Sequence, residues 1–185
     1  MKKSWEQIHQ ELSAPFSHED VEWKIQTVSK DKSRGLAVAY ITARAIQNRL
    51  DAAVGAQNWK PVFRQWHTVT DRDGNPIPSQ LCSIQIYDED RHEWLEKTDG
   101  AENTDYEPIK GGLSDAMKRA ASQWGIGRYL YKMETPWVDV EFFGKTAVIA
   151  KKERPGLDKI HDNFVAKLKG RSPAGSHAAE DRRDR

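Results

Sequence analysis

Three strand-like segments, separated by short polar turns and followed by one long amphipathic helix, most constrain what this chain can fold into. We expect strands over 58–70, 79–87 and 92–98, because alternating apolar residues fill these runs and polar turns at 71–75 and 88–91 separate them. Strands joined by short turns pair antiparallel. The sequence therefore predicts an α+β fold in which a β-meander packs on a helix, and it disfavours a doubly wound nucleotide-binding fold.

The long helix is expected to start at Ile109 and to carry two different faces. Its apolar stripe has helical spacing and should face the meander; the stripe is Leu113, Met117, Ala120 and Trp124. The other face carries Lys110, Ser114 and Lys118 at intervals of four, with Arg119 beside them and Asp115 four residues before Arg119. Such a cationic stripe can follow a phosphate backbone, although an ordinary solvated helix face has the same pattern.

The remaining elements are predicted from caps and periodicity. Ser4 and Gln7 form a capping box for a helix over 5–12. A strand over 21–29 should return through a polar turn to a strand over 36–41, and Thr42 should cap a helix that Gly55 ends. The rest of the chain is expected to hold a polar loop over 99–107, a short turn over 128–131, strands around 138–142 and 146–150, and an amphipathic helix over 157–168.

Length and composition indicate one domain with a short C-terminal extension. In a chain of 185 residues we expect a domain over 1–155 with its core at about 21–150, an amphipathic helix over 156–170 and a disordered tail over 171–185. No apolar run is long enough for a membrane span and the N-terminus lacks a signal sequence. Because Cys82 is the single cysteine, a disulfide framework is excluded, and we expect a protein of a reducing cytoplasm.

Charge is balanced overall but unevenly distributed. The chain has 29 basic and 28 acidic residues. Acidic residues dominate 84–107, whereas basic residues dominate 109–133 and 151–171. This asymmetry predicts one positive and one negative face, the alternative being that both are ordinary solvated surface.

Enzyme and cofactor motifs are incomplete. The segment Gly144-Lys145-Thr146 lacks the first glycine of a phosphate-binding loop, because Asp139 occupies that position. Acidic residues at 71–75 and 88–90 read as hairpin turns of solvated charge, and the histidines show no metal-ligand spacing. We therefore expect no enzymatic activity, cofactor or metal, with a metal-dependent nuclease that uses the acidic segment as the least favoured alternative.

Two segments resemble a known family. The first runs through 111–121 (GGLSDAMKRAA) and 124–131 (WGIGRYLY), and the second through 40–46 (YITARAI) and 54–59 (VGAQNW). In this order they resemble the Rad52/Rad22 single-strand annealing family, especially its bacterial and phage branch that includes DdrA. The resemblance covers roughly residues 21–131, and its two segments lie on either side of the predicted meander. It implies a protein of the bacterial cytoplasm or nucleoid, or one encoded by a phage.

The resemblance implies a β-β-β-α core that assembles into a homo-oligomeric ring, with single-stranded DNA in a groove and its bases free to pair without ATP. It implies annealing of complementary strands in recombination and double-strand break repair, or, as the alternative, passive protection of single-stranded ends. Lys118 and Arg119 match the family's basic pair, and Arg44 matches a basic residue of the earlier helix. Where eukaryotic members carry a further arginine this chain has Ser122, and Arg128 could supply that charge. Lys110 and Lys132 are weaker candidates, and a single-strand-binding protein or recombinase partner stays open.

Overall fold

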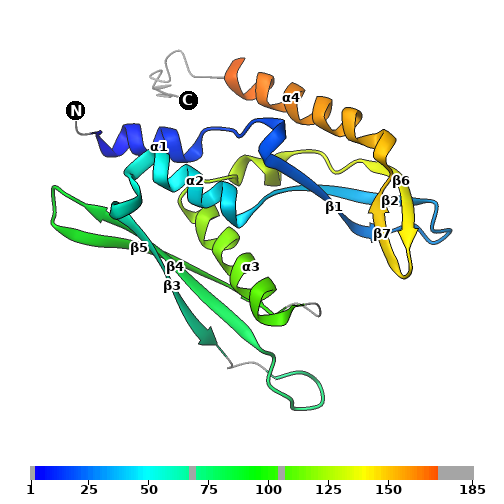
Figure 1. The fold of residues 1–185 in the computed structure, drawn as a ribbon, viewed down its shortest axis with the longest axis horizontal. Coiled ribbons are helices and arrows are strands. Elements are labelled where there is room, and N and C mark those ends of the chain that lie inside the picture. Colours follow the sequence, from blue (N-terminus) through cyan, green and yellow to red (C-terminus); the bar gives the residue numbers. More distant parts are fainter. Residues whose placement is uncertain (1–2, 67–69, 104–106, 171–185) are drawn as a thin grey trace, which may run out of the picture.

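The structure is a computed structural model that describes residues 3–66, 70–103 and 107–170. Within these residues the chain forms two antiparallel sheets with helices around and between them (Figure 1). The first sheet has the strand order β1-β2-β6-β7, with bounds Val21–Val28, Arg34–Ile41, Trp137–Phe143 and Thr146–Ile149. The second has the order β3-β4-β5, with bounds Trp59–Trp66, Ser79–Asp88 and Glu93–Glu102. The predicted meander is confirmed.

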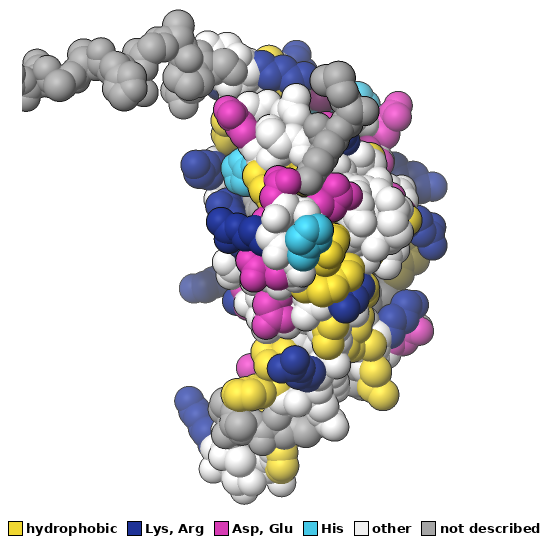
Figure 2. Space-filling model, turned by 90° about the vertical axis from the view of Figure 1, so that its left-hand side faces the viewer, with side chains coloured by type: hydrophobic (Ala, Val, Ile, Leu, Met, Phe, Trp, Pro, Cys, Tyr) yellow, Lys and Arg dark blue, Asp and Glu magenta, His cyan; other side chains and the backbone are white. Residues whose placement is uncertain are grey.

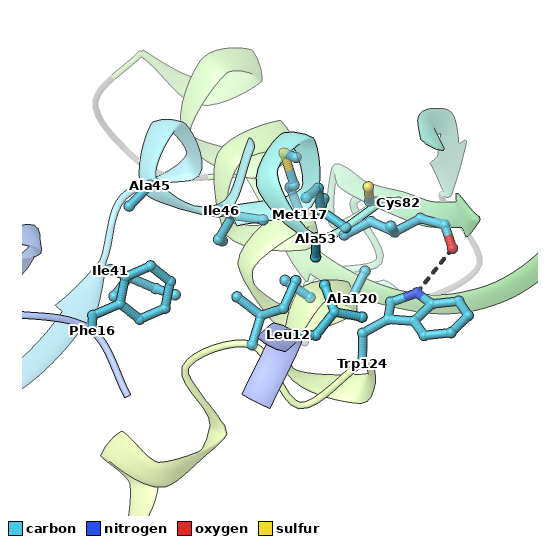
Figure 3. Packing of buried hydrophobic residues seen from close by; sticks show 14 of the residues in the cluster. Leu12, Phe16, Ile41, Ala45, Ile46, Ala53, Cys82, Met117, Ala120 and Trp124 are labelled. Atoms are coloured by element: carbon cyan, nitrogen blue, oxygen red, sulfur yellow. Dashed lines mark hydrogen bonds between the residues drawn. The ribbon is translucent and has the colours of Figure 1, made fainter. Parts of the chain in front are cut away.

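Helix α3 (Pro108–Gln123) packs on the inner face of the second sheet, as its apolar stripe predicts. Alternate residues of β4 are fully buried beneath it, namely Cys82, Ile84 and Ile86. The helix contributes Met117 and Ala120 to the same cluster, and its C-cap residue Trp124 joins them (Figure 3). The indole Nε1 of Trp124 donates a hydrogen bond to the Ile84 carbonyl at 3.1 Å, so the end of the helix is fixed to the central strand.

Three further helices cover the sheets. Helices α1 (Trp5–Ser13) and α2 (Ala43–Val54) begin at the predicted caps, because Ser4 accepts from the Gln7 amide and Thr42 accepts from the Ala45 amide. Helix α4 (Arg154–Gly170) crosses the opposite side of the molecule from the second sheet (Figure 1). Short 3-10 turns complete the fold: η1 (His18–Asp20), η2 (Ala56–Asn58), η3 (Arg128–Lys132) and η4 (Lys151–Glu153).

The principal correction concerns strand β5. The polar loop predicted over 99–107 is wrong for residues 99–102, which extend β5 and pair with residues 79–82 of β4. The polarity of Asp99 and Glu102 suggested a loop, but the neighbouring strand supplies backbone partners that composition does not reveal. The rest of the predicted loop includes residues 104–106, which lie outside the described residues. Residues 67–69 of the strand predicted over 58–70 and the predicted tail over 171–185 also lie outside them.

The main hydrophobic core joins both layers. It runs from Leu12 and Phe16 through Ile46 and Leu50 of α2 to the inner face of β4. Cys82 belongs to this core with no exposed surface, as its mid-strand position predicts. No helix among the described residues is long and apolar enough to cross a membrane.

Candidate nucleic-acid interface

A groove of about 740 Å³ lies where the two layers meet. One wall comes from neighbouring strands β1 and β2, and the other comes from α3 and the end of β5. The turn η3 and the residues that follow it close the end of the groove. The site is therefore built from segments that lie more than a hundred residues apart in the sequence, and its shape depends on how the two sheets are placed relative to each other.

Lys118 reaches the groove because it lies on the face of α3 that points away from the core. Its neighbours Met117 and Ala120 are buried, while the Lys118 side chain keeps 26% of its surface exposed. The Lys118 ammonium lies 3.0 Å from the Asp115 carboxylate, one helical turn earlier. The same ammonium lies 5.0 Å from the centre of the Tyr40 ring.

Tyr40 brings a second cation into the groove. The Lys24 ammonium of β1 lies 5.6 Å from the centre of the Tyr40 ring, so one aromatic ring of β2 lies close to two ammonium groups from different elements. The Tyr40 hydroxyl donates to the Glu22 carboxylate. Burial, and then the nearby Glu22 carboxylate, raise the pKa of Tyr40 to about 12, so the phenol stays neutral. Lys24 was missed by the sequence interpretation because nothing local in its strand connects it with α3.

Arg119 is fixed by contacts to the second sheet. Its Nε donates to the Asp99 carboxylate at 3.0 Å, and the Gln123 side chain donates to the other carboxylate oxygen at 3.3 Å. Burial raises the pKa of Asp99, but hydrogen bonds from the Gly100 amide, Arg119 and Gln123 outweigh it and hold that pKa below its usual value. The carboxylate therefore stays ionised. Arg119 is 56% exposed and lines the groove, and a guanidinium has donors beyond the one used here.

The other predicted cations lie outside this groove. Arg128 donates to the carbonyls of Ser122 and Gln123, both at 2.6 Å, and so caps the C-terminal end of α3. Lys110 pairs with Glu107 at 2.8 Å at the opposite end of the helix. Arg44 on α2 and Lys132 in η3 are exposed, and neither is among the described residues that line the groove. The structure thus brings Lys118 and Arg119 together and leaves the other four apart.

The closed end of the groove is apolar and aromatic. Ile126, Leu130 and Met133 line it together with Tyr131, which is 74% exposed. Gly127 allows this end to approach β2, because a side chain there would meet the Ile41 methyl group at 2.6 Å. The groove therefore offers ammonium and guanidinium groups from both walls and an apolar surface at its end, which suits a polymer in which charged groups alternate with flat aromatic rings.

The acidic turn between β4 and β5 differs from its prediction. Asp88 is only 3% exposed, and its carboxylate accepts hydrogen bonds from the Asp90 and Arg91 amides. The expectation of a fully solvated turn is therefore wrong for Asp88, which shapes the turn. Across residues 3–66, 70–103 and 107–170, no three His, Cys, Asp or Glu side chains are grouped so that they could hold a metal ion.

Known proteins are similar to this chain over most of its length. The model of the Rad52/22 family of double-strand break repair proteins matches residues 4–147. The chain is 36% identical over 131 residues to the single-stranded DNA-binding protein DdrA of Deinococcus deserti, and 34% identical over 132 residues to DdrA of Deinococcus radiodurans. Each match covers 71% of this chain, and it covers 60% and 58% of the two relatives, so the chain spans little more than half of their length.

Proposed function

Because the chain belongs to the Rad52/22 family of double-strand break repair proteins, we propose that it binds single-stranded DNA in the groove between β1–β2 and α3. The observation that carries this proposal is the meeting of Lys24 from β1 with Lys118 and Arg119 from α3 in one groove, although the two segments are distant in the sequence. The relatives named as single-stranded DNA-binding proteins support it.

The proposed activity is annealing of complementary strands without ATP, in recombination and double-strand break repair. Lys and Arg contact phosphates irrespective of sequence, so these cations would hold the backbone of any strand. Backbone contacts also reduce the repulsion between two strands while the base edges stay free to pair. Lys118, Arg119 and Lys24 would form the main contacts, and Arg44, Lys110 and Lys132 would add charge at the periphery.

We further propose that copies of this chain assemble into a ring, which would join short grooves into a continuous track. The outer face of the second sheet supports such an assembly, since alternation places Trp66 and Trp94 there, 47% and 39% exposed. In Figure 2 hydrophobic side chains form a band that runs toward the lower end of the molecule, where Figure 1 places the second sheet. In this proposal residues 1–155 form the annealing domain, and the helix over 156–170 braces it.

The test follows the pairing of two complementary dye-labelled oligonucleotides over time, without nucleotide. The wild-type protein is compared with K118A/R119A and with K167A/K169A. The control removes the same charge from exposed positions of α4 that are not among the described lining of the groove. We expect the wild type and the control to accelerate pairing, and K118A/R119A to lose both tight binding and acceleration.

A third variant checks the cation that only the structure reveals. We expect K24A to weaken single-strand binding, whereas K30A in the exposed turn before β2 should not. Binding without acceleration by the wild type would favour end protection over annealing. Equal binding by the wild type and K118A/R119A would place the site elsewhere and contradict the proposal.

A further inference from the structure

Each of the two groove cations on α3 already has a carboxylate at hydrogen-bonding distance. Asp99 lies 3.0 Å from Arg119, and Asp115 lies 3.0 Å from Lys118. We propose that Asp99 and Asp115 are built-in competitors of the DNA phosphate, which keep each strand exchangeable. This inference rests on the proposed function, because it concerns how the same site releases its ligand.

The two carboxylates are held in place by different means. Asp99 comes from β5, is 21% exposed and accepts further hydrogen bonds from the Gln123 side chain and the Gly100 amide. Asp115 comes from α3 itself and lines the groove one turn before Lys118. Each carboxylate contacts its cation without DNA, so both cations are already oriented and their charge is partly neutralised.

A carboxylate and a phosphate compete for the same donors. Both are anions whose two terminal oxygens accept charge-assisted hydrogen bonds from ammonium and guanidinium groups. An incoming phosphate must therefore share Lys118 and Arg119 with these carboxylates or displace them, and it also meets their negative charge. The first effect weakens binding, and the second reduces the net charge that a strand neutralises, which flattens the salt dependence.

Weak and reversible contacts suit the proposed activity. Two strands find their register only when unproductive contacts are released, so a groove of unpaired cations would hold each strand too long. When a DNA phosphate dissociates, each cation regains its contact with the internal carboxylate, which lowers the free-energy cost of dissociation. The same contacts would not be required of a protein that only coats single strands.

The test uses the isosteric variants D99N and D115N, which remove the charge and keep an oxygen that can accept from the same cation. We expect each variant to bind a single-stranded oligonucleotide up to about fivefold more tightly, the upper end of what exposed ion pairs contribute. The slope of log affinity against log salt should steepen by up to about 0.7 for each carboxylate. A bound labelled strand should also leave more slowly when challenged with unlabelled strand.

The matched control is E102Q, which removes one negative charge from a groove-lining residue. The exposed Glu102 side chain has no ion-pair partner among the described residues, so E102Q measures the general effect of charge. Tighter binding by D99N or D115N than by E102Q supports the inference. Binding no tighter than E102Q, or weaker than wild type, overturns it, because the carboxylates would then only orient the cations. Failure of the wild type to bind would instead overturn the proposed function.

Discussion

The hydroxyl of Tyr129 lies 2.8 Å from Nε2 of His161 in the interior, where it joins the turn η3 to helix α4. The same hydroxyl accepts a hydrogen bond from the Phe16 amide at 3.2 Å. Burial raises the pKa of Tyr129 to about 12, so the phenol is neutral under ordinary conditions. Because Leu130 and Tyr131 line the groove next to this residue, the contact braces the end of the groove.

Removing this hydroxyl should destabilise the protein. In Y129F the Phe16 amide and the His161 ring, which is 1% exposed, lose a partner inside the core. We expect a loss of about 2 kcal/mol in the free energy of unfolding, measured by urea denaturation. Y131F removes the same atom from a largely exposed side chain and should change little. A loss of unfolding free energy in Y129F no larger than that in Y131F would show that the interior hydroxyl does not stabilise the fold.

Stability should depend on pH through the pair formed by His18 and Asp162, whose atoms lie 3.0 Å apart. The hydrogen bond to Asp162 raises the pKa of His18 above 6.5, and it lowers the pKa of Asp162 below 3.8. The His18 contribution is full below pH 6.5 and is lost as pH rises through the raised pKa, while that of Asp162 is lost as pH falls through its lowered pKa. Both contributions are therefore complete between pH 3.8 and pH 6.5, where the pair stabilises the fold most.

The corresponding variant is H18Q, compared with wild type by thermal unfolding at about pH 5 and about pH 9. We expect a small loss of stability at the lower pH and a smaller or absent one at the higher pH, where His18 is neutral in both states. Asp162 also lies 3.4 Å from the His161 ring, so D162N should reduce stability by more than H18Q. A deficit that grows with pH would contradict this assignment.

Close approach at Gly127 should make that position intolerant of a side chain. Gly127 has a φ of +67°, and a Cβ atom would lie 2.6 Å from the Ile41 methyl group. Gly144 has a φ of +61° with open space around it, so G144A measures backbone strain alone, about 1 kcal/mol. We expect G127A to cost at least about 1 kcal/mol more and to weaken single-strand binding. Equal losses in urea denaturation would show that Ile41 yields without cost.

Arg128 should affect stability more than DNA binding. It caps two carbonyls of α3 and is not among the described groove-lining residues. We expect R128A to lower the free energy of unfolding by about 1 to 2 kcal/mol, because charge-assisted hydrogen bonds to the helix end are lost. Its affinity for single strands should stay close to that of the wild type in a direct titration. A large loss of affinity in a stably folded R128A would return this residue to the binding site.

Cys82 should report unfolding. Burial raises the pKa of its thiol to about 12 and leaves it no exposed surface. We expect a thiol reagent at about pH 8 to label the native protein only as fast as it opens, and the urea-unfolded protein at once. As the chain has a single cysteine, the signal is unambiguous. Rapid labelling of the folded protein would show that this part of the core is accessible.

Local signals account for what the sequence predicted well. Thr42 and Gly55 bound α2 as expected, because a side-chain cap and a positive φ are decided within a few residues. Lys118 and Arg119 share the outward side of α3 because the apolar spacing of that helix fixes which side faces the core. For the same reason Trp124 was correctly predicted as a core residue, and it is 6% exposed.

The features that were missed all depend on contacts between distant segments. Lys24 reaches the groove only because the first sheet stands opposite α3. Asp99 belongs to a strand because β4 pairs with it, although the polar composition of the segment 99–107 suggests a loop. The binding role of Arg128 stays a prediction, and its contacts with the end of α3 could not be foreseen, because they depend on how the break at 125–127 turns the chain back.

The chain returns to its first sheet after it has built the second. Strand β6 pairs with β2, where Arg34 lies opposite Asp139, although β3, β4, β5 and α3 lie between them in sequence. Because the chain leaves the first sheet, builds the second and then returns, neither sheet can be excised with the groove as a minimal binding fragment. A shortened protein for engineering would have to keep everything from β1 to β6.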